Sequence, residues 1–232
     1  GKQRIGVRVS ILPCSISSDD ASNLIKQLKT KVVVTCNLSN YQIASLIADS
    51  DIAHMLLFPN IPHQVPNSFY VDTEKLAGLW IEHLAKRGHR KIAHLHGVQE
   101  EAYSLTMQQY LFNYYKKMNE YELLVDPDLV LYGGFSSDEG YRNTNRLFDT
   151  GKVFSAIIIN DLIVNGVYQA IQERGLVVGE DISVIGTDDL EWCRHLKPPL
   201  TSTRIAIEDT IGRIMTNLQY LLDNPRKELK PE

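Results

Sequence analysis

The sequence predicts an α/β fold with parallel sheets, on three observations. Short apolar runs rich in β-branched residues alternate along the chain with stretches of helical periodicity. These runs are apolar at consecutive positions, as expected for strands that helices cover on both faces. The length of 232 residues exceeds that of a usual single domain, so two sheets in two lobes fit the chain.

The individual elements follow from the same pattern. The expected strands are residues 5–9, 32–35, 54–58, 91–95, 129–131, 156–159 and 182–185, and the expected helices are residues 74–85, 106–118, 138–148, 162–172 and 207–222. Gly88 and Gly175 follow helical stretches, where glycine commonly ends a helix. Asp161 is the expected N-cap of the helix after it, and Ser136 or Ser137 caps the helix that begins near residue 138.

Two lobes are expected, with boundaries set by these elements. Residues 1–72 and about 205–232 form the N-terminal lobe and hinge, and residues 73–204 form most of the C-terminal lobe. The helix at 74–85 is a candidate for the lobe or dimer interface. Residues 5–10 run directly into the apolar stretch 11–16, although parallel neighbours need a connection of roughly a dozen residues. Either these form one long strand or, as we favour, a crossover helix is missing after Ser10.

Composition and charge narrow the function classes. The formal net charge of -4 argues against this segment binding nucleic acid by itself, because phosphate neutralisation needs clustered Lys and Arg. Cys14, Cys36 and Cys193 are an odd number without metal-type spacing, so reduced, mostly buried thiols are expected. No apolar run approaches the roughly 18 residues of a membrane helix, and the start does not resemble a signal peptide. A cytoplasmic location without membrane contact is expected.

A set of short phrases carries the most specific signal, because their order and spacing together are difficult to obtain by chance. In chain order they are Val71-Asp72, Glu82-His83-Leu84, Gly88-His89-Arg90-Lys91-Ile92-Ala93, Asn160-Asp161-Leu162, Glu180-Asp181-Ile182-Ser183-Val184-Ile185-Gly186, Asp188-Asp189 and Pro198-Pro199-Leu200-Thr201. This series closely resembles the LacI/GalR family of bacterial transcription regulators, firmly from about Tyr70 to Ile207 and thinly before that.

The resemblance implies both a fold and a function. The fold is two Rossmann-like lobes with parallel sheets, of the type I periplasmic-binding-protein kind, with a small effector in the cleft between them. The chain is then the effector-binding and dimerisation core of a DNA-binding regulator that senses a sugar-like ligand. Such a protein is a homodimer and contacts operator DNA only through an N-terminal headpiece that this chain does not contain.

Asn160 and Asp188 are the leading ligand-binding candidates. In the family, matching residues hydrogen-bond the effector. Independently, both follow expected strands, and ligands of open parallel sheets bind beyond the carboxyl ends of strands. A short carboxamide or carboxylate suits a polyol because it orients neighbouring hydroxyls. The plainer alternative for Asn160 is a loop or cap residue, and Asp189 is expected to be structural.

Two positions depart from the family pattern. Thr106 stands where the family usually has the Arg of an Arg-x-x-Gly-Tyr phrase, ahead of Gln109-Tyr110. The change removes a bidentate donor for carboxylates and clustered hydroxyls, so an anionic effector is less expected, and Thr106 is a ligand candidate with a single hydroxyl. Near Phe58-Pro59-Asn60 the usual Asp is also missing, and Asn60 is the candidate substitute.

Aromatic side chains are expected to complete a sugar site, because the C–H face of a pyranose stacks on a ring. Trp192, four residues past Asp188, is the first candidate, Phe58 the second and Tyr103 the third. Core or loop packing is the alternative for each. Trp80 lies within an expected helix, where burial in the core or an interface is favoured.

Competing functions have weaker support. His83, His89, His94 and His96 lack the spacing of a metal site, so structural roles are favoured and neither a metal nor a cofactor is expected. The chain contains no nucleophile elbow, phosphate loop or dinucleotide fingerprint, which argues against an enzyme.

The stronger rival is a periplasmic sugar-binding protein of a transport system, which shares the two-lobed architecture. A basic helix-turn-helix at the native N-terminus would favour the regulator, and a secretory leader the transporter.

Overall fold

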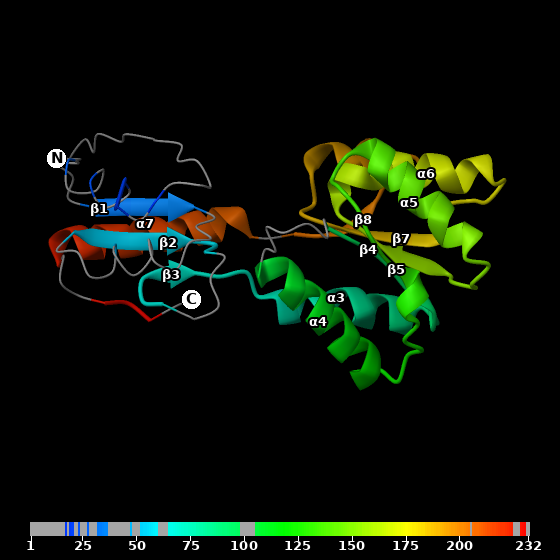
Figure 1. Cartoon of the computed structure of the whole chain (residues 1–232), viewed down its shortest axis with the longest axis horizontal. Coiled ribbons are helices and arrows are strands. Elements are labelled where there is room, and N and C mark those ends of the chain that lie inside the picture. Colours follow the sequence, from blue (N-terminus) through cyan, green and yellow to red (C-terminus); the bar gives the residue numbers. More distant parts are fainter. Residues whose placement is uncertain are drawn as a thin grey trace. The chain divides into compact units, whose positions relative to one another are not determined.

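The structure is a computed structural model that describes residues 32–36, 52–59, 65–97, 105–204, 206–224 and 228–230, together with positions 17, 19, 20, 23, 27 and 47. The chain divides into two compact units (Figure 1). Unit 1 comprises Gly1–Tyr70 and Ile211–Glu232, and unit 2 comprises Val71–Thr210.

Unit 1 is built on a parallel sheet. Among the described residues its strands are β1 (Val32–Cys36), β2 (Ala53–Leu57) and β3 (Ser68–Phe69), in that order across the sheet. Helix α7 (Ile207–Asp223) covers this sheet, with Leu221 buried against Met55 and Phe69. The strand expected at residues 5–9, and the crossover helix expected to be missing after residue 10, lie outside the described residues.

Unit 2 contains a second parallel sheet, with strand order β5-β4-β6-β7-β8. The strands are β4 (Ile92–His96), β5 (Val130–Tyr132), β6 (Ala156–Ile158), β7 (Ser183–Thr187) and β8 (Thr201–Thr203). The helices are α3 (Thr73–Lys86), α4 (Leu105–Glu120), α5 (Ser137–Asp149) and α6 (Val164–Glu173), with 3-10 helices η1 (Pro127–Leu129), η2 (Asp161–Ile163) and η3 (Glu191–His195). The predicted α/β class with parallel sheets is confirmed in both units.

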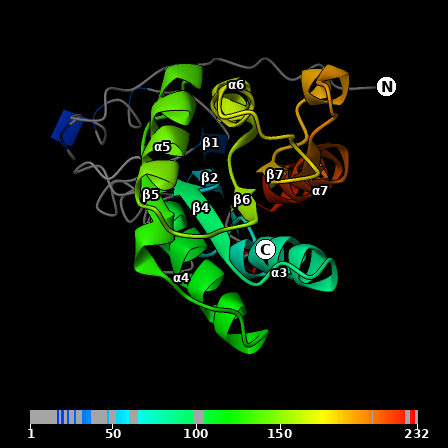
Figure 2. The ribbon, with the colours of Figure 1, turned by 90° about the vertical axis from the view of Figure 1, so that its right-hand side faces the viewer.

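Helices cover the unit 2 sheet on both faces, which explains its continuously apolar strands. Figure 2 shows α5 and α6 on one face and α3 and α4 on the other. Alternate positions of the same strands serve two cores: Ile157 packs with α5 and α6, whereas Ile158 packs with α3 and α4. The sheet is therefore the buried centre of unit 2, and the loops at its strand ends are anchored to buried strands.

Helix ends in unit 2 match the sequence signals in all but one case. Gly88 follows α3 with φ 90° and Gly175 follows α6 with φ 74°, the left-handed conformation in which glycine is least strained. Ser136 is the N-cap of α5 and accepts from the backbone N–H of Glu139 at 3.2 Å. The prediction that Asp161 caps the next helix is wrong, because the N-cap of η2 is Asn160.

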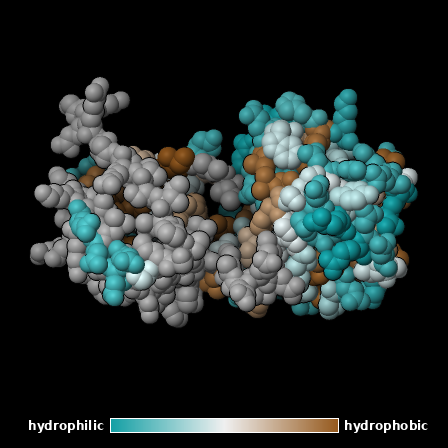
Figure 3. Space-filling view, turned by 45° about the horizontal axis from the view of Figure 1, so that its top comes forward, coloured by the Kyte–Doolittle hydropathy of each residue, from teal (hydrophilic) through white to brown (hydrophobic). Residues whose placement is uncertain are grey.

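The surface of unit 2 is mostly hydrophilic on the face seen in Figure 3, with separate apolar patches. The apolar side of α3 faces inward, and Trp80, Ile81 and Leu84 are buried in the core, while Leu79 is 44% exposed. Most of the apolar surface of α3 is therefore covered by α4 and the sheet. Within the described residues, no helix has the length and apolar character that a membrane span needs.

Candidate functional site

A pocket of about 250 Å³ lies in unit 2, where the loops that follow β4, β6 and β7 meet α3 and α4. Its lining residues are Trp80, His94, Leu95, His96, Gly97, Met107, Tyr110, Phe135, Ile159, Asn160, Leu162, Thr187 and Asp188. A cavity of roughly 150 Å³ already accommodates a benzene ring, so this pocket has room for one substituted ring. It lies at the carboxyl ends of parallel strands, the usual ligand position in such sheets.

Asp188 and Asn160 meet at the polar side of this pocket. The side-chain amide of Asn160 donates to the Asp188 carboxylate at 2.9 Å. The other end of the same amide, Oδ1, accepts from the backbone N–H of Leu162 at 2.9 Å, which is the cap of η2. The two roles expected for Asn160, ligand binding and helix capping, therefore do not exclude each other, because Oδ1 caps η2 while Nδ2 points to Asp188.

Asp188 itself has an unusual backbone. Its φ is 102°, a region that glycine adopts readily and other residues seldom enter. Its N–H donates to the carbonyl of Thr203 at 2.9 Å, which ties the turn to β8. Strained conformations of this kind persist where the surrounding structure holds them, and they concentrate at ligand sites. The turn directs a carboxylate to the pocket at some cost in backbone energy.

Aromatic rings form the apolar side of the pocket. Trp80 from α3 and Tyr110 from α4 lie with ring centroids 5.7 Å apart. The indole N–H of Trp80 donates to Thr203 at 3.1 Å, so that ring is held in one orientation. Burial and the nearby charge of Asp188 raise the pKa of Tyr110 to about 12, so its phenol stays protonated. These rings offer a rigid apolar surface beside the Asp188 carboxylate.

Two buried histidines of β4 complete the pocket floor. His94 Nε2 and His96 Nδ1 are 3.0 Å apart, and the His94 ring stacks on Tyr114 with centroids 5.0 Å apart. Burial lowers the pKa of His96 to about 4. Burial, and secondarily the neighbouring His96, lower the pKa of His94 well below its ordinary value. Both rings are consequently neutral at pH 7, and no group of three His, Cys, Asp or Glu among the described residues is arranged to hold a metal.

The carboxylates that flank the site have structural roles. Asp161 is fully buried and accepts from the Leu190 N–H at 2.9 Å and from the Ser202 hydroxyl at 2.8 Å. Burial raises its pKa. Asp189 accepts from Arg204 Nε at 2.6 Å and, unlike Asp188, does not line the pocket. Together these contacts hold the loop after β7 against β8.

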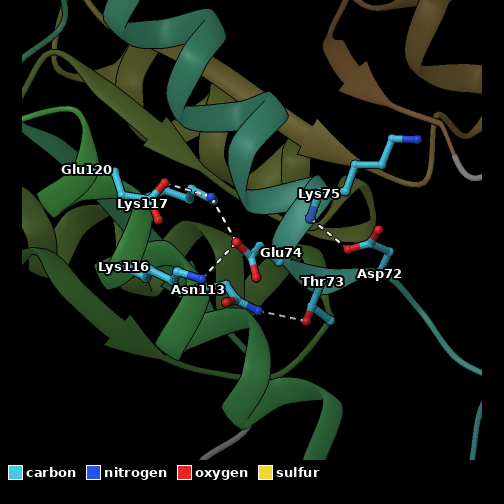
Figure 4. Close-up of polar contacts among 8 residues, drawn as sticks. All are labelled: Asp72, Thr73, Glu74, Lys75, Asn113, Lys116, Lys117 and Glu120. Carbon is cyan, nitrogen blue, oxygen red and sulfur yellow. Dashed lines mark hydrogen bonds and ion pairs between the residues drawn. The ribbon is translucent and has the colours of Figure 1, made fainter.

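Polar contacts join the N-terminus of α3 to the C-terminal half of α4, the two helices that supply Trp80 and Tyr110 (Figure 4). The buried Asn113 amide donates to the Thr73 hydroxyl at 2.9 Å. On the surface, Glu74 accepts from Lys116 at 2.8 Å and from Lys117 at 3.1 Å. These contacts lie outside the pocket and join the two helices that supply its aromatic rings.

The remaining sequence candidates lie in several places. Thr106 is in the first turn of α4, next to Met107 and four residues before Tyr110. Trp192 lies in η3, is 37% exposed and does not line the pocket. Phe58 belongs to unit 1, where its N–H donates to the carbonyl of Phe69 at 2.7 Å. Tyr103 and Asn60 lie outside the described residues.

The sequence reading missed most of the aromatic lining. Tyr110 could have been found, because it is the last residue of the phrase in which Thr106 replaces Arg. Trp80 was expected to be buried, and it is, but it also lines the pocket. His94, His96 and Phe135 have no local signal for a site. They line the pocket only because β4 and the end of β5 are neighbours in the sheet.

Comparison with known proteins identifies the family. The model of the periplasmic binding protein-like domain matches residues 81–232. The chain belongs to this family. The chain is 31% identical, over 177 residues and 72% of its length, to the "HTH-type transcriptional repressor PurR" of Haemophilus influenzae. The chain spans 52% of that relative's length.

Solved structures of similar domains agree with this family. A sugar-binding transcriptional regulator of the LacI family from Escherichia coli, complexed with phosphate, matches 90% of the chain and 76% of its own, with a TM-score of 0.80 and 25% identity. The lac repressor bound to ONPG matches 92% of the chain and 65% of its own, with a TM-score of 0.73 and 26% identity. The resemblance to LacI/GalR regulators stated from the sequence is confirmed, and these relatives favour a regulator core over a transport protein.

Proposed function

We propose that this chain is the effector-binding and dimerisation core of a bacterial DNA-binding transcription regulator, that it works in the cytoplasm, and that it acts as a sensor and not as an enzyme. The effector is a small sugar or sugar derivative. The observation that carries the proposal is the pocket of unit 2, where the Asp188 carboxylate, oriented by Asn160, faces the rings of Trp80 and Tyr110. A polar edge beside an apolar face suits a pyranose, which presents hydroxyls on its rim and C–H groups on its faces.

Switching requires only that the effector prefer one conformation of the regulator. A ligand shifts an equilibrium between conformations by its difference in affinity for them, and DNA affinity changes by the same coupling. Operator contact belongs to a headpiece outside this chain, because the net charge of -4 does not favour phosphate binding. A mobility-shift assay with operator fragments should show no specific complex for this chain alone, and sedimentation should show a dimer.

The binding site is tested by a matched pair of variants. Asp188→Asn and Asp189→Asn each remove one carboxylate with almost no change in side-chain shape, and both replace an aspartate at a positive φ. A thermal-shift screen of hexoses, pentoses, disaccharides, sugar phosphates and nucleosides identifies the ligand, and calorimetry measures its affinity. Asp188→Asn should weaken binding at least tenfold, since a charged hydrogen bond contributes about 1.5–3 kcal/mol.

Asp189→Asn is the control, because Asp189 pairs with Arg204 and does not line the pocket. It should change the affinity less than twofold. Equal affinities for the wild-type protein and Asp188→Asn, with unchanged thermal unfolding, would remove Asp188 from the site and with it the proposed function of this pocket.

A further inference from the structure

The charge of the pocket lining restricts what can bind there. Among the described residues that line it, Asp188 is the only side chain with a formal charge at neutral pH. No Lys or Arg is present among the described lining residues, and the neighbouring Arg204 is engaged by Asp189. The two histidines add no positive charge, because burial lowers the pKa of each. A bound anion would meet one negative charge and no positive charge on these walls.

The helix end in the lining does not offset this charge. Backbone N–H groups at helix N-termini commonly bind anions when they are unoccupied. In η2 the N–H of Leu162 is already occupied by Asn160 Oδ1 at 2.9 Å. The side-chain N–H of Asn160 is likewise directed to Asp188. These two donors, the Leu162 N–H and the Asn160 N–H that points to Asp188, are thus already engaged within the protein.

His94, which lines the pocket, carries a buried nitrogen without a hydrogen-bond partner in the described structure. His94 is 4% exposed, and its Nδ1 has no hydrogen-bond partner in the described structure, whereas its Nε2 is paired with His96. A neutral imidazole has one donor and one acceptor nitrogen, so Nδ1 lacks a partner in either tautomer. Buried polar atoms in native proteins are almost always paired, and an unpaired one calls for an explanation such as a ligand.

His94 and Asp188 lie at different depths of the same pocket. His94 is level with Ile158 of β6, which is in turn level with Ile185 of β7. Asp188 lies three positions after Ile185, beyond the end of the strand. The Trp80 ring, whose centroid is 6.1 Å from that of His94 and 5.7 Å from that of Tyr110, supplies an apolar wall of the pocket together with Tyr110. A single ring with a polar group at each end matches this order of surfaces.

We propose that the pocket takes an uncharged ring compound whose hydroxyl or amino groups meet Asp188 at the rim and His94 at the floor, and that it rejects the phosphorylated forms of such compounds. This inference rests on the proposed function, since it names the chemical class of the effector. Neutral glycosides and nucleosides share the required chemistry: a ring with apolar faces and donor groups on its edge. A sugar phosphate carries the same ring and differs by the group that the lining disfavours.

The test compares neutral compounds with their own phosphates. Calorimetry on the whole chain measures phenyl β-D-glucoside against phenyl β-D-glucoside 6-phosphate, and adenosine against adenosine 5′-monophosphate. In the pair that binds, the neutral member should bind at least tenfold more tightly. The pair that binds also shows whether the effector is a glycoside or a nucleoside. Tighter binding of a phosphorylated member, equal binding of both members, or binding of neither pair would overturn the inference.

A gain-of-charge variant tests the cause of the selectivity. Thr106→Arg places a guanidinium in the first turn of α4, beside Met107 of the lining, and should raise the affinity for the phosphorylated member at least tenfold. Thr106→Gln adds length without charge and should leave the preference for the neutral member unchanged. An equal effect of both variants would contradict an electrostatic origin.

The role of His94 is tested separately. His94→Phe keeps a ring stacked on Tyr114 but removes both nitrogens, and it should weaken binding of the neutral member at least fivefold. Circular dichroism of the variant verifies its fold, and an unchanged affinity in a folded variant would exclude a contact between the ligand and His94. The outcomes distinguish the two proposals. If a phosphorylated compound binds tightly and Asp188→Asn abolishes that binding, only the proposed selectivity is wrong. If the affinity for every ligand is the same in the wild-type protein and in Asp188→Asn, the proposed binding site is wrong.

Discussion

Asn160 and Asp188 are joined by a 2.9 Å hydrogen bond in which the amide donates to the carboxylate. The residues are 28 positions apart in sequence and follow neighbouring strands, β6 and β7. Because Asn160 Oδ1 accepts from Leu162, the orientation of the amide is determined, and with it the oxygen of Asp188 that it holds. Asn160 is therefore a positioning residue for Asp188 as well as a member of the lining.

The first prediction concerns this bond. Asn160→Asp retains an oxygen that can cap η2 but replaces the donor to Asp188 with a second carboxylate. The two negative charges should repel, so the ligand affinity should fall at least tenfold at pH 7.5 in calorimetry. Lowering the pH to 5.5 should restore part of it, because closely spaced carboxylates share a proton more readily. Wild-type affinity in Asn160→Asp at pH 7.5 would show that the bond has no effect on binding.

The second prediction concerns pH and the histidine pair. The pKa of His96 is lowered to about 4 in the folded protein, so between pH 6.5 and 4 the unfolded chain binds more protons there. The contribution of the neutral His96 to the free energy of unfolding is therefore fully present above pH 6.5 and is lost as the pH falls from 6.5 towards 4. From pH 7 to pH 5 the loss from His96 should be about 2 kcal/mol of unfolding free energy, and His94, whose pKa shifts in the same direction, adds to it.

Urea denaturation of the wild-type protein and of His96→Gln across this range measures the effect. Removing the imidazole should reduce the slope of stability against pH. Identical slopes for the two proteins would contradict a neutral, buried His96.

The third prediction concerns the junction between α3 and α4. Thr73→Val removes the acceptor of the Asn113 amide, which is buried, so the donor is left without its partner (Figure 4). An unsatisfied buried donor costs about 1–3 kcal/mol. Thermal and chemical unfolding should show this loss. Glu74→Gln, a control at the adjacent exposed ion pairs, should change the melting temperature little, because exposed pairs are screened by water. A larger loss of stability in Glu74→Gln than in Thr73→Val would contradict a stabilising role of the buried hydrogen bond.

The fourth prediction compares two helical glycines. A Cβ on Gly166 of α6 would lie 1.8 Å from the Ser137 carbonyl oxygen, an overlap with backbone that cannot rotate away. Gly166→Ala should destabilise the protein by about 3 kcal/mol or more, since the close packing of α5 on α6 would be forced apart. A Cβ on Gly212 of α7 meets nothing within 4 Å, so Gly212→Ala should stabilise by up to about 1 kcal/mol. Chemical denaturation of both variants checks the difference in sign.

Much of the fold could be predicted from local patterns. The strands expected at 91–95 and 156–159 correspond to β4 and β6, because consecutive apolar, β-branched residues suit a strand buried on both faces. The short strands β3 and β8 were not predicted. Segments of two or three residues carry no periodicity, and they become strands only where a neighbouring strand offers its backbone.

The local sequence by itself determined the α/β class, most of the helix ends, and Asn160 and Asp188 as candidate site residues, since hydrophobic period, most caps and strand-end positions depend on neighbouring residues in the chain. Tertiary structure alone decided the rest. It made Asn160 and not Asp161 the cap, buried Asp161 against Ser202, and gave Trp80, His94 and Tyr110 to the pocket while leaving Trp192 outside its lining. The physical reason is that hydrogen bonds and pocket walls join residues on neighbouring strands and packed helices, and those neighbours are set by the order of strands in the sheet.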